Sequence, residues 1–223
     1  MQDHVRSEFR FTQLLVATVL LMIGYPYFSD DSVGAFLGGM SSLIICCAGV
    51  YAVHTTRWRF AAAIVFALFA AGSLTVIDFV QGVRGHPLVE FSFFLFYSFI
   101  TLAVFLEVIQ TIDIKRDTIF GTVAVYLLVG LTFGTLYDFV ETISPGSFHA
   151  HVVFAGVDGG LGFRQLLYFS FMTLTTVGYG DITAVTAPAQ SVVAIEGVIG
   201  VLYVAVLVAR IVGIYSAKRE SDF

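Results

Sequence analysis

Residues 175–181 read Thr175-Thr176-Val177-Gly178-Tyr179-Gly180-Asp181, and they directly follow a short apolar segment at residues 163–174. A helix needs roughly 20 residues to cross a bilayer, so this segment is expected to enter and return on the same side. Gly178 and Gly180 can adopt positive φ at little cost, which lets successive carbonyl groups turn to one side of the strand. Peptide oxygens arranged in this way can replace the hydration shell of a cation, and Thr176 adds a hydroxyl at the inner end.

The rest of the chain has the composition of a membrane protein. Of its 223 residues 58% are hydrophobic and only 12% are charged, which is too apolar for a soluble domain of this size. Apolar runs separated by short segments with charged residues, Gly or Pro predict six membrane spans, at residues 11–28, 33–53, 60–80, 88–109, 119–139 and 189–215. The predicted fold class is therefore an all-α membrane protein with six transmembrane helices, a re-entrant helix and a loop at residues 175–181.

The basic residues give an independent test of this count. If both termini are cytoplasmic, the outer side of the membrane receives only Arg84 and Arg164 out of the 11 Lys and Arg residues. Arg210 lies inside the last predicted span and is placed on the inner side because its long side chain can reach the interface. This distribution predicts a multi-pass protein of the cell membrane with cytoplasmic N- and C-termini and an outward-facing re-entrant segment.

Composition also argues against several other classes of function. The net charge of −5 and the scattered basic residues do not provide a nucleic-acid surface. Cys46 and Cys47 are adjacent in an apolar run, so they cannot join distant segments and do not form a metal site by themselves. Neither a nucleophile–base pair nor a metal-ligand cluster is evident, so the chain is not expected to be an enzyme or to need a cofactor.

The string from Thr176 to Gly180 resembles the signature of the pore-loop potassium channels, and the run from Ala194 to Gly213 looks like the inner helix of small bacterial channels in that superfamily. The resemblance covers residues 163–215 and is only topological over the first 140 residues. It implies potassium ions bound by the backbone and side-chain oxygens of Thr176, Val177, Gly178 and Tyr179. It also implies a homotetramer, because one strand cannot close a ring of oxygens.

The resemblance divides the chain into two domains. Residues 1–112 are expected to form a four-helix transmembrane domain that scaffolds the pore or binds membrane lipids. Residues 113–223 are expected to form the pore domain, with an outer helix at 119–139, a turret at 141–162, a pore helix at 163–174, the filter at 175–181 and an inner helix at 189–215. Voltage-gated relatives carry basic residues at every third position of the fourth helix, but residues 88–109 contain none. Weak voltage dependence is therefore expected.

Four residues are expected to support the filter. Met172 stands where some channels of the family carry a glutamate that pairs with the aspartate after the filter. We therefore expect Thr175, Tyr168 and Glu196 to hold the filter region, with Asp181 bonding from its outer end. Glu196 is ionisable within a membrane span and so is a candidate for function. The alternative is that Glu196 is protonated and satisfied by a nearby hydroxyl.

The inner helix carries candidates for a hinge and a gate. Gly200 stands about twenty residues beyond the filter, and it serves either as a hinge or as a site of close packing. Val201, Val204, Val208 and Val212 follow at steps of three or four and share one helix face. This face is expected to line the central cavity and to form a hydrophobic gate. Four acidic residues near the ends of spans are expected to be solvated, namely Asp78, Glu90, Glu107 and Asp138.

These observations predict a potassium-selective ion channel whose partners are other copies of the same chain, membrane lipids and potassium ions. Two alternatives remain open. A non-selective cation channel would follow if the filter were not rigid, because residue identity alone does not guarantee rigidity. The second alternative is that the chain is an accessory membrane subunit that does not conduct ions.

Overall fold

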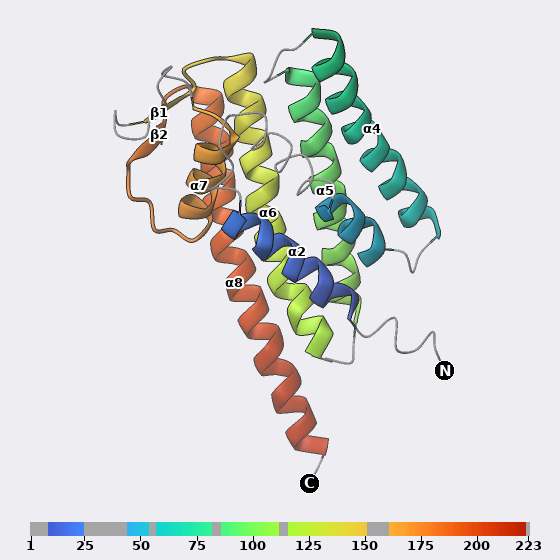
Figure 1. The fold of residues 1–223 in the computed structure, drawn as a ribbon. Helices are drawn as coiled ribbons and strands as arrows, with labels where there is room; N and C mark the ends of the chain where they lie inside the picture. Colours follow the sequence, from blue (N-terminus) through green and yellow to red (C-terminus); the bar gives the residue numbers. More distant parts are fainter. Residues whose placement is uncertain are drawn as a thin grey trace.

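The computed structural model describes residues 9–24, 44–53, 57–81, 86–111, 116–150 and 161–221. This part of the chain is mainly helical (Figure 1). The helices are α2 (Arg10–Gly24), α4 (Arg57–Gln81), α5 (Pro87–Gln110), α6 (Arg116–Ile143), α7 (Phe163–Leu174) and α8 (Ala187–Ser221). Residues 44–52 are also helical, and two short strands are β1 (Phe148–Ala150) and β2 (Ile182–Ala184).

Within these described ranges, 3 helical stretches are long and apolar enough to cross a membrane: Pro87–Gln110, Asp117–Ile143 and Ala187–Leu207. The chain is therefore a mainly α-helical membrane protein. The predicted span at 60–80 corresponds to α4, and the span at 11–28 begins as α2. Residues 25–28 and the first part of the span at 33–53 lie outside the described residues. The count of six spans stays a prediction.

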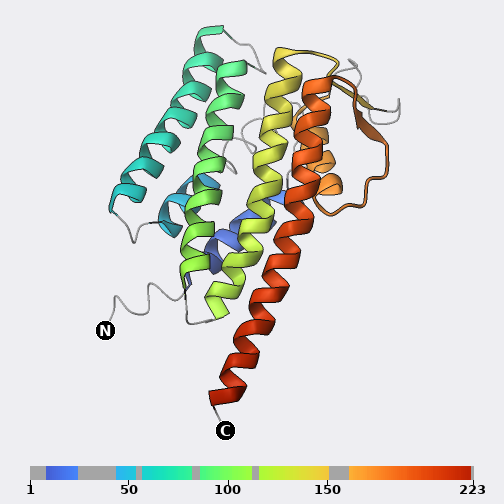
Figure 2. The same ribbon diagram turned by 180° about the vertical axis from the view of Figure 1, so that it is seen from behind.

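Helix α6 occupies the centre of the arrangement, with α5 and α8 on either side of it (Figures 1 and 2). Helix α2 lies obliquely across α6, and the C-terminal part of α8 extends past the other described helices. A hydrophobic core joins α2, α5, α6 and α7 through buried side chains that include Leu14, Ile100, Leu128 and Leu174. This core crosses the predicted domain boundary at residues 112 and 113, so the two predicted domains pack closely within one chain.

The expectation of solvated carboxylates is wrong at three positions where neighbouring helices cover the side chain. Asp138 on α6 is buried, with 9% of its surface exposed, and its carboxyl group is hydrogen-bonded to that of the half-buried Glu90 on α5. Glu107 on α5 forms an ion pair with Arg10 at 2.6 Å between Oε1 and Nη1. Nearby, Asp117 at the start of α6 accepts hydrogen bonds from the backbone N–H and hydroxyl of Thr12, at 2.9 and 2.7 Å. These contacts fix the beginning of α2 against the junction of α5 and α6.

The predicted turret contains one short strand, β1, which pairs with β2 in the segment after residue 181, and neither strand was predicted. Strands β1 and β2 are antiparallel, with Phe148 opposite Ala184 and Ala150 opposite Ile182. The pair forms because residues 148–150 lie beside residues 182–184, and the two backbones then bond to each other. The outer helix ends at Ile143 rather than at residue 139.

Candidate functional site

Helix α7 has the bounds that the sequence predicts for the re-entrant helix, Phe163–Leu174. It packs against α6 at two glycines, where a side chain would collide with it. A Cβ added at Gly130 would lie 2.5 Å from Cε1 of Phe171, and one at Gly134 would lie 2.8 Å from Cδ1 of Leu167. Small residues let helix backbones approach closely. The two glycines therefore set how deeply α7 sits against α6.

The strand after α7 alternates the sign of φ. The positive values are 60° at Thr176, 52° at Gly178 and 74° at Gly180. Positive φ was predicted at the two glycines and is confirmed there, whereas Thr176 was not predicted to adopt it. A non-glycine residue in this region is strained by about 1–3 kcal/mol, and such strain is concentrated at functional sites. The alternation turns peptide groups that would otherwise point to opposite sides of an extended strand.

Short backbone hydrogen bonds hold the inner end of this strand to the end of α7. The N–H of Thr176 donates to the carbonyl of Thr173 at 2.9 Å, and the N–H of Gly178 donates to the carbonyl of Met172 at 3.1 Å. The Thr175 hydroxyl donates to the carbonyl of Phe171 at 2.6 Å. Residues 175–180 are exposed in the single chain, and 72% of the surface of Tyr179 is accessible.

Tyr168 and Asp181 lie together, as the sequence predicts. The Tyr168 hydroxyl donates to Oδ2 of Asp181 at 2.8 Å, and Oδ1 of Asp181 accepts from the N–H of Ile182 at 3.0 Å. Burial, followed by the hydrogen bond to Asp181 and the negative charge of that residue, raises the pKa of Tyr168 to about 12. The phenol is therefore a hydrogen-bond donor at neutral pH, and it joins α7 to the segment that follows the predicted filter strand.

Glu196 does not take part in the contact between Tyr168 and Asp181. Its carboxyl group is fully buried and accepts a hydrogen bond from the Tyr137 hydroxyl at Oε2. The Ser170 hydroxyl lies 2.5 Å from Oε1 of Glu196 and 2.7 Å from the carbonyl of Gly130. These groups join α6, α7 and α8 behind the re-entrant helix. Glu196 and Tyr168 thus make separate contacts. The nearby hydroxyl that the alternative for Glu196 required is present, whereas its protonation and its support of the filter stay predictions.

Sequence reasoning missed Tyr137 and Ser170. A carboxyl group within a membrane span needs hydrogen-bond donors from neighbouring segments, so hydroxyl side chains in the adjacent apolar runs were the available signal. Many such residues are present, and their spacing along the chain does not show which of them faces Glu196. The selection depends on how α6, α7 and α8 pack together.

The C-terminal end of α7 contacts both flanking helices. The Tyr126 hydroxyl on α6 donates to the carbonyl of Leu174 at 3.1 Å. Gly200 on α8 faces the same carbonyl, and a Cβ added there would overlap the oxygen of Leu174. Close packing therefore accounts for this glycine, while its role as a hinge stays a prediction.

The valine face on α8 is only partly described. Val201 and Val204 are exposed at 54% and 47%. The side chains of Val208 and Val212 lie outside the described residues. A gate at this face stays a prediction.

Comparison with known proteins gives two matches. Residues 119–217 match the protein family described as "Ion channel". The mouse (Mus musculus) protein named "Potassium channel, subfamily K, member 16" is 39% identical over 69 residues, which are 31% of this chain and 20% of the relative. The chain thus spans about a fifth of the length of this curated relative. No solved structure gave a significant match. The matching family is a family of ion channels and not of enzymes.

Proposed function

We propose that this chain, which matches a family of ion channels over residues 119–217 and is similar to a potassium channel over 69 residues, forms a homotetramer that conducts potassium ions passively across the cell membrane. The ions would be bound in rings of oxygens from Thr176, Val177, Gly178 and Tyr179. The observation that carries the proposal is the alternating sign of φ at residues 176, 178 and 180. This backbone directs neighbouring carbonyls toward one side, as a carbonyl filter requires.

Exposure of the filter strand supports assembly with other copies. Val177 and Tyr179 are exposed in the single chain, although they are apolar or aromatic. The described part of α8 also leaves large apolar side chains uncovered, including Ile195, Val198 and Val201. A closed ring of four chains would cover these surfaces and place four filter strands around one axis. The negative end of each α7 dipole would then favour cations near the axis.

Other residues of the site would support the filter strand and form the gate. Thr175, Tyr168 and Asp181 hold the two ends of the filter strand, and Glu196 holds the helices behind it. Val201, Val204, Val208 and Val212 would line the cavity below the filter. The inner hydrophobic gate would form on this face and close by excluding water.

Reconstitution in liposomes tests the function. Purified protein should release potassium down its gradient, and bi-ionic reversal potentials should favour potassium over sodium. Equal permeability would identify a non-selective cation channel, and absence of flux from purified tetramers would identify an accessory subunit. Either result would overturn the proposal.

Two glycine variants make the test specific for the filter. Gly178 and Gly146 both have positive φ, and a Cβ added at either would meet nothing within 4 Å. Replacement by alanine therefore introduces similar backbone strain at each position without a collision. Gly178→Ala should abolish selective flux, whereas Gly146→Ala, in the turret, should preserve it. Equal effects of the two variants would contradict the assignment of the filter.

A further inference from the structure

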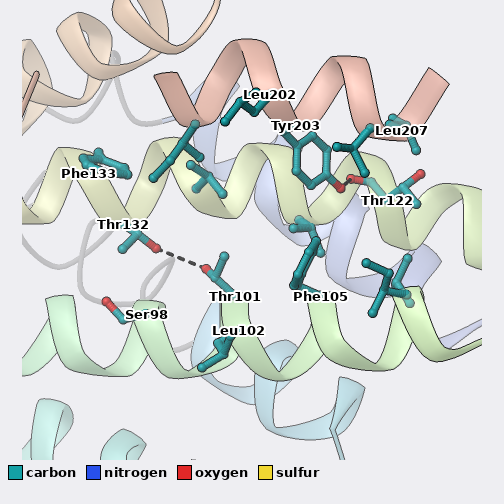
Figure 3. A pocket seen from close by; sticks show the side chains of 16 residues that line it. Ser98, Thr101, Leu102, Phe105, Thr122, Thr132, Phe133, Leu202, Tyr203 and Leu207 are labelled. Atoms are coloured by element: carbon teal, nitrogen blue, oxygen red, sulfur yellow. Dashed lines mark hydrogen bonds between the residues drawn. The ribbon is translucent and has the colours of Figure 1, made fainter. Parts of the chain in front are cut away.

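A pocket of about 500 Å³ lies between α5, α6 and α8. Figure 3 shows side chains from all three helices turned toward it, among them Ser98 and Phe105 of α5 and Tyr203 of α8. All three helices contain a stretch that is long and apolar enough to cross a membrane. The volume lies in the range of pockets that hold small ligands.

Several hydroxyl groups in the pocket wall are already bonded to one another or to the backbone. Thr132 donates to the carbonyl of Leu128 at 2.8 Å, so its oxygen is left to accept the bond from Thr101 at 3.1 Å. Thr122 donates to the carbonyl of Ile119, and Tyr203 donates to the carbonyl of Thr122, both at 2.6 Å. The rest of the wall is mainly aliphatic and aromatic, so a polar ligand would find few partners in it.

The apolar wall of the pocket and its depth in the membrane indicate which ligand would fill it. Water is not expected to fill a mainly apolar pocket in which the hydroxyls of Thr101, Thr122, Thr132 and Tyr203 already have partners. An empty space of this size also loses the contacts of its lining atoms. At the depth of the membrane core, the available material is the hydrocarbon of lipid chains. A flexible acyl chain needs no polar partner and can adapt to an elongated space between helices.

The pocket lies behind the predicted gate. Ile199, Tyr203 and Val206 line it at steps of three or four along α8. Val201 and Val204, on the predicted cavity face, project from the opposite side of the same helix. We infer that this pocket binds the acyl chain of a membrane phospholipid, and that the bound chain opposes movement of α8 away from the pore axis. The second part rests on the proposed function, whereas the binding does not.

Fluorescence quenching tests the binding. The chain contains 1 Trp, Trp58, so Trp58→Phe gives a background free of tryptophan. In this background, Phe105→Trp places a reporter in the pocket, and Phe96→Trp places one at a fully buried position of α5 outside it. In liposomes of phosphatidylcholine with brominated acyl chains, the reporter at 105 should be quenched and the reporter at 96 should be spared. Tyr97→Trp, also in the buried core, is the alternative control if the variant at 96 does not fold.

A filling substitution then tests whether the chain enters the pocket itself. Ser98→Phe adds a ring to the wall and should reduce quenching of the reporter at 105 several-fold. Unchanged quenching would show that lipid reaches the reporter from outside the pocket, and that result would overturn the inference. Absence of quenching in the unfilled protein would overturn it as well, and would indicate that protein, such as a second copy of the chain, occupies the space.

Flux measurements test the effect on the gate. Ser98→Phe acts as a permanent occupant and should slow potassium flux several-fold. Leu88→Phe, at an exposed position of α5 outside the pocket, should leave flux unchanged. Normal flux in the Ser98→Phe protein would overturn the effect on α8. If quenching occurs as expected but the unmodified protein carries no flux, the proposed function fails and the acyl-chain site stands.

Discussion

The hydroxyl of Tyr168 lies 2.8 Å from Oδ2 of Asp181 and joins α7 to the segment that follows the predicted filter. Tyr168→Phe removes this bond with little change in shape. We expect faster loss of potassium flux during sustained conduction and a lower preference for potassium over sodium. A double-mutant cycle with Asp181→Asn should give a coupling free energy of about 1 kcal/mol in thermal unfolding. Additive effects of the two substitutions would show that the bond does not support the fold.

The same bond predicts the response to alkaline pH. The pKa of Tyr168 is raised to about 12 from the ordinary value of 10.0, chiefly by burial and then by the bond and charge of Asp181. Because the folded-state pKa is the higher one, the stabilisation is fully present below pH 10 and is lost as the pH rises through 12. Absorbance titration of the original protein minus that of Tyr168→Phe should show one tyrosine ionising near pH 12. Ionisation near pH 10 would contradict the contact.

A polar and an apolar replacement of Glu196 should change the free energy of unfolding by different amounts. Glu196→Gln keeps oxygen and nitrogen atoms near Tyr137 and Ser170 and should change the free energy of unfolding only slightly. Glu196→Leu leaves two buried hydroxyls without this partner and should destabilise the fold by about 2–4 kcal/mol. Thermal unfolding of the reconstituted protein measures both. Equal stability of the two variants would show that hydrogen bonding at Glu196 is unimportant.

Two glycines one turn apart on α8 provide a matched pair. A Cβ at Gly200 would overlap the carbonyl oxygen of Leu174, whereas a Cβ at Gly197 would meet nothing within 4 Å. Gly200→Ala should therefore push α8 away from the end of α7 and greatly reduce both stability and flux. Gly197→Ala should be neutral or slightly stabilising, because alanine favours the helix. The explanation fails if the two variants behave alike.

Voltage dependence should be weak. Helix α5, the predicted fourth span, contains no Lys or Arg from Pro87 to Gln110. Each charge that moves through the membrane field contributes about 2.3 kcal/mol per 100 mV, and steep gating needs several such charges. The conductance–voltage relation in a planar bilayer should therefore be shallow. A steep relation would indicate that charges elsewhere in the chain move through the field.

Much of the site could be predicted because its signals are local. The bounds of α7 follow from a short apolar run between polar and glycine-containing segments, and Gly178 and Gly180 mark the positions of positive φ. Thr176 escaped prediction because a threonine adopts this conformation only where its surroundings enforce it. The pairing of β1 with β2 also escaped prediction, because each strand has only 3 residues and depends on its partner.

The sequence by itself determined the membrane class, the short helix α7 and the positive φ of Gly178 and Gly180, since hydropathy and backbone freedom belong to individual segments. Only the tertiary structure decided that Glu196 contacts Tyr137 and Ser170, that Gly200 faces Leu174, and that a pocket lies behind α8. The physical reason is that these contacts join residues on different helices. Their distances depend on how the helices pack, which no single segment of the sequence specifies.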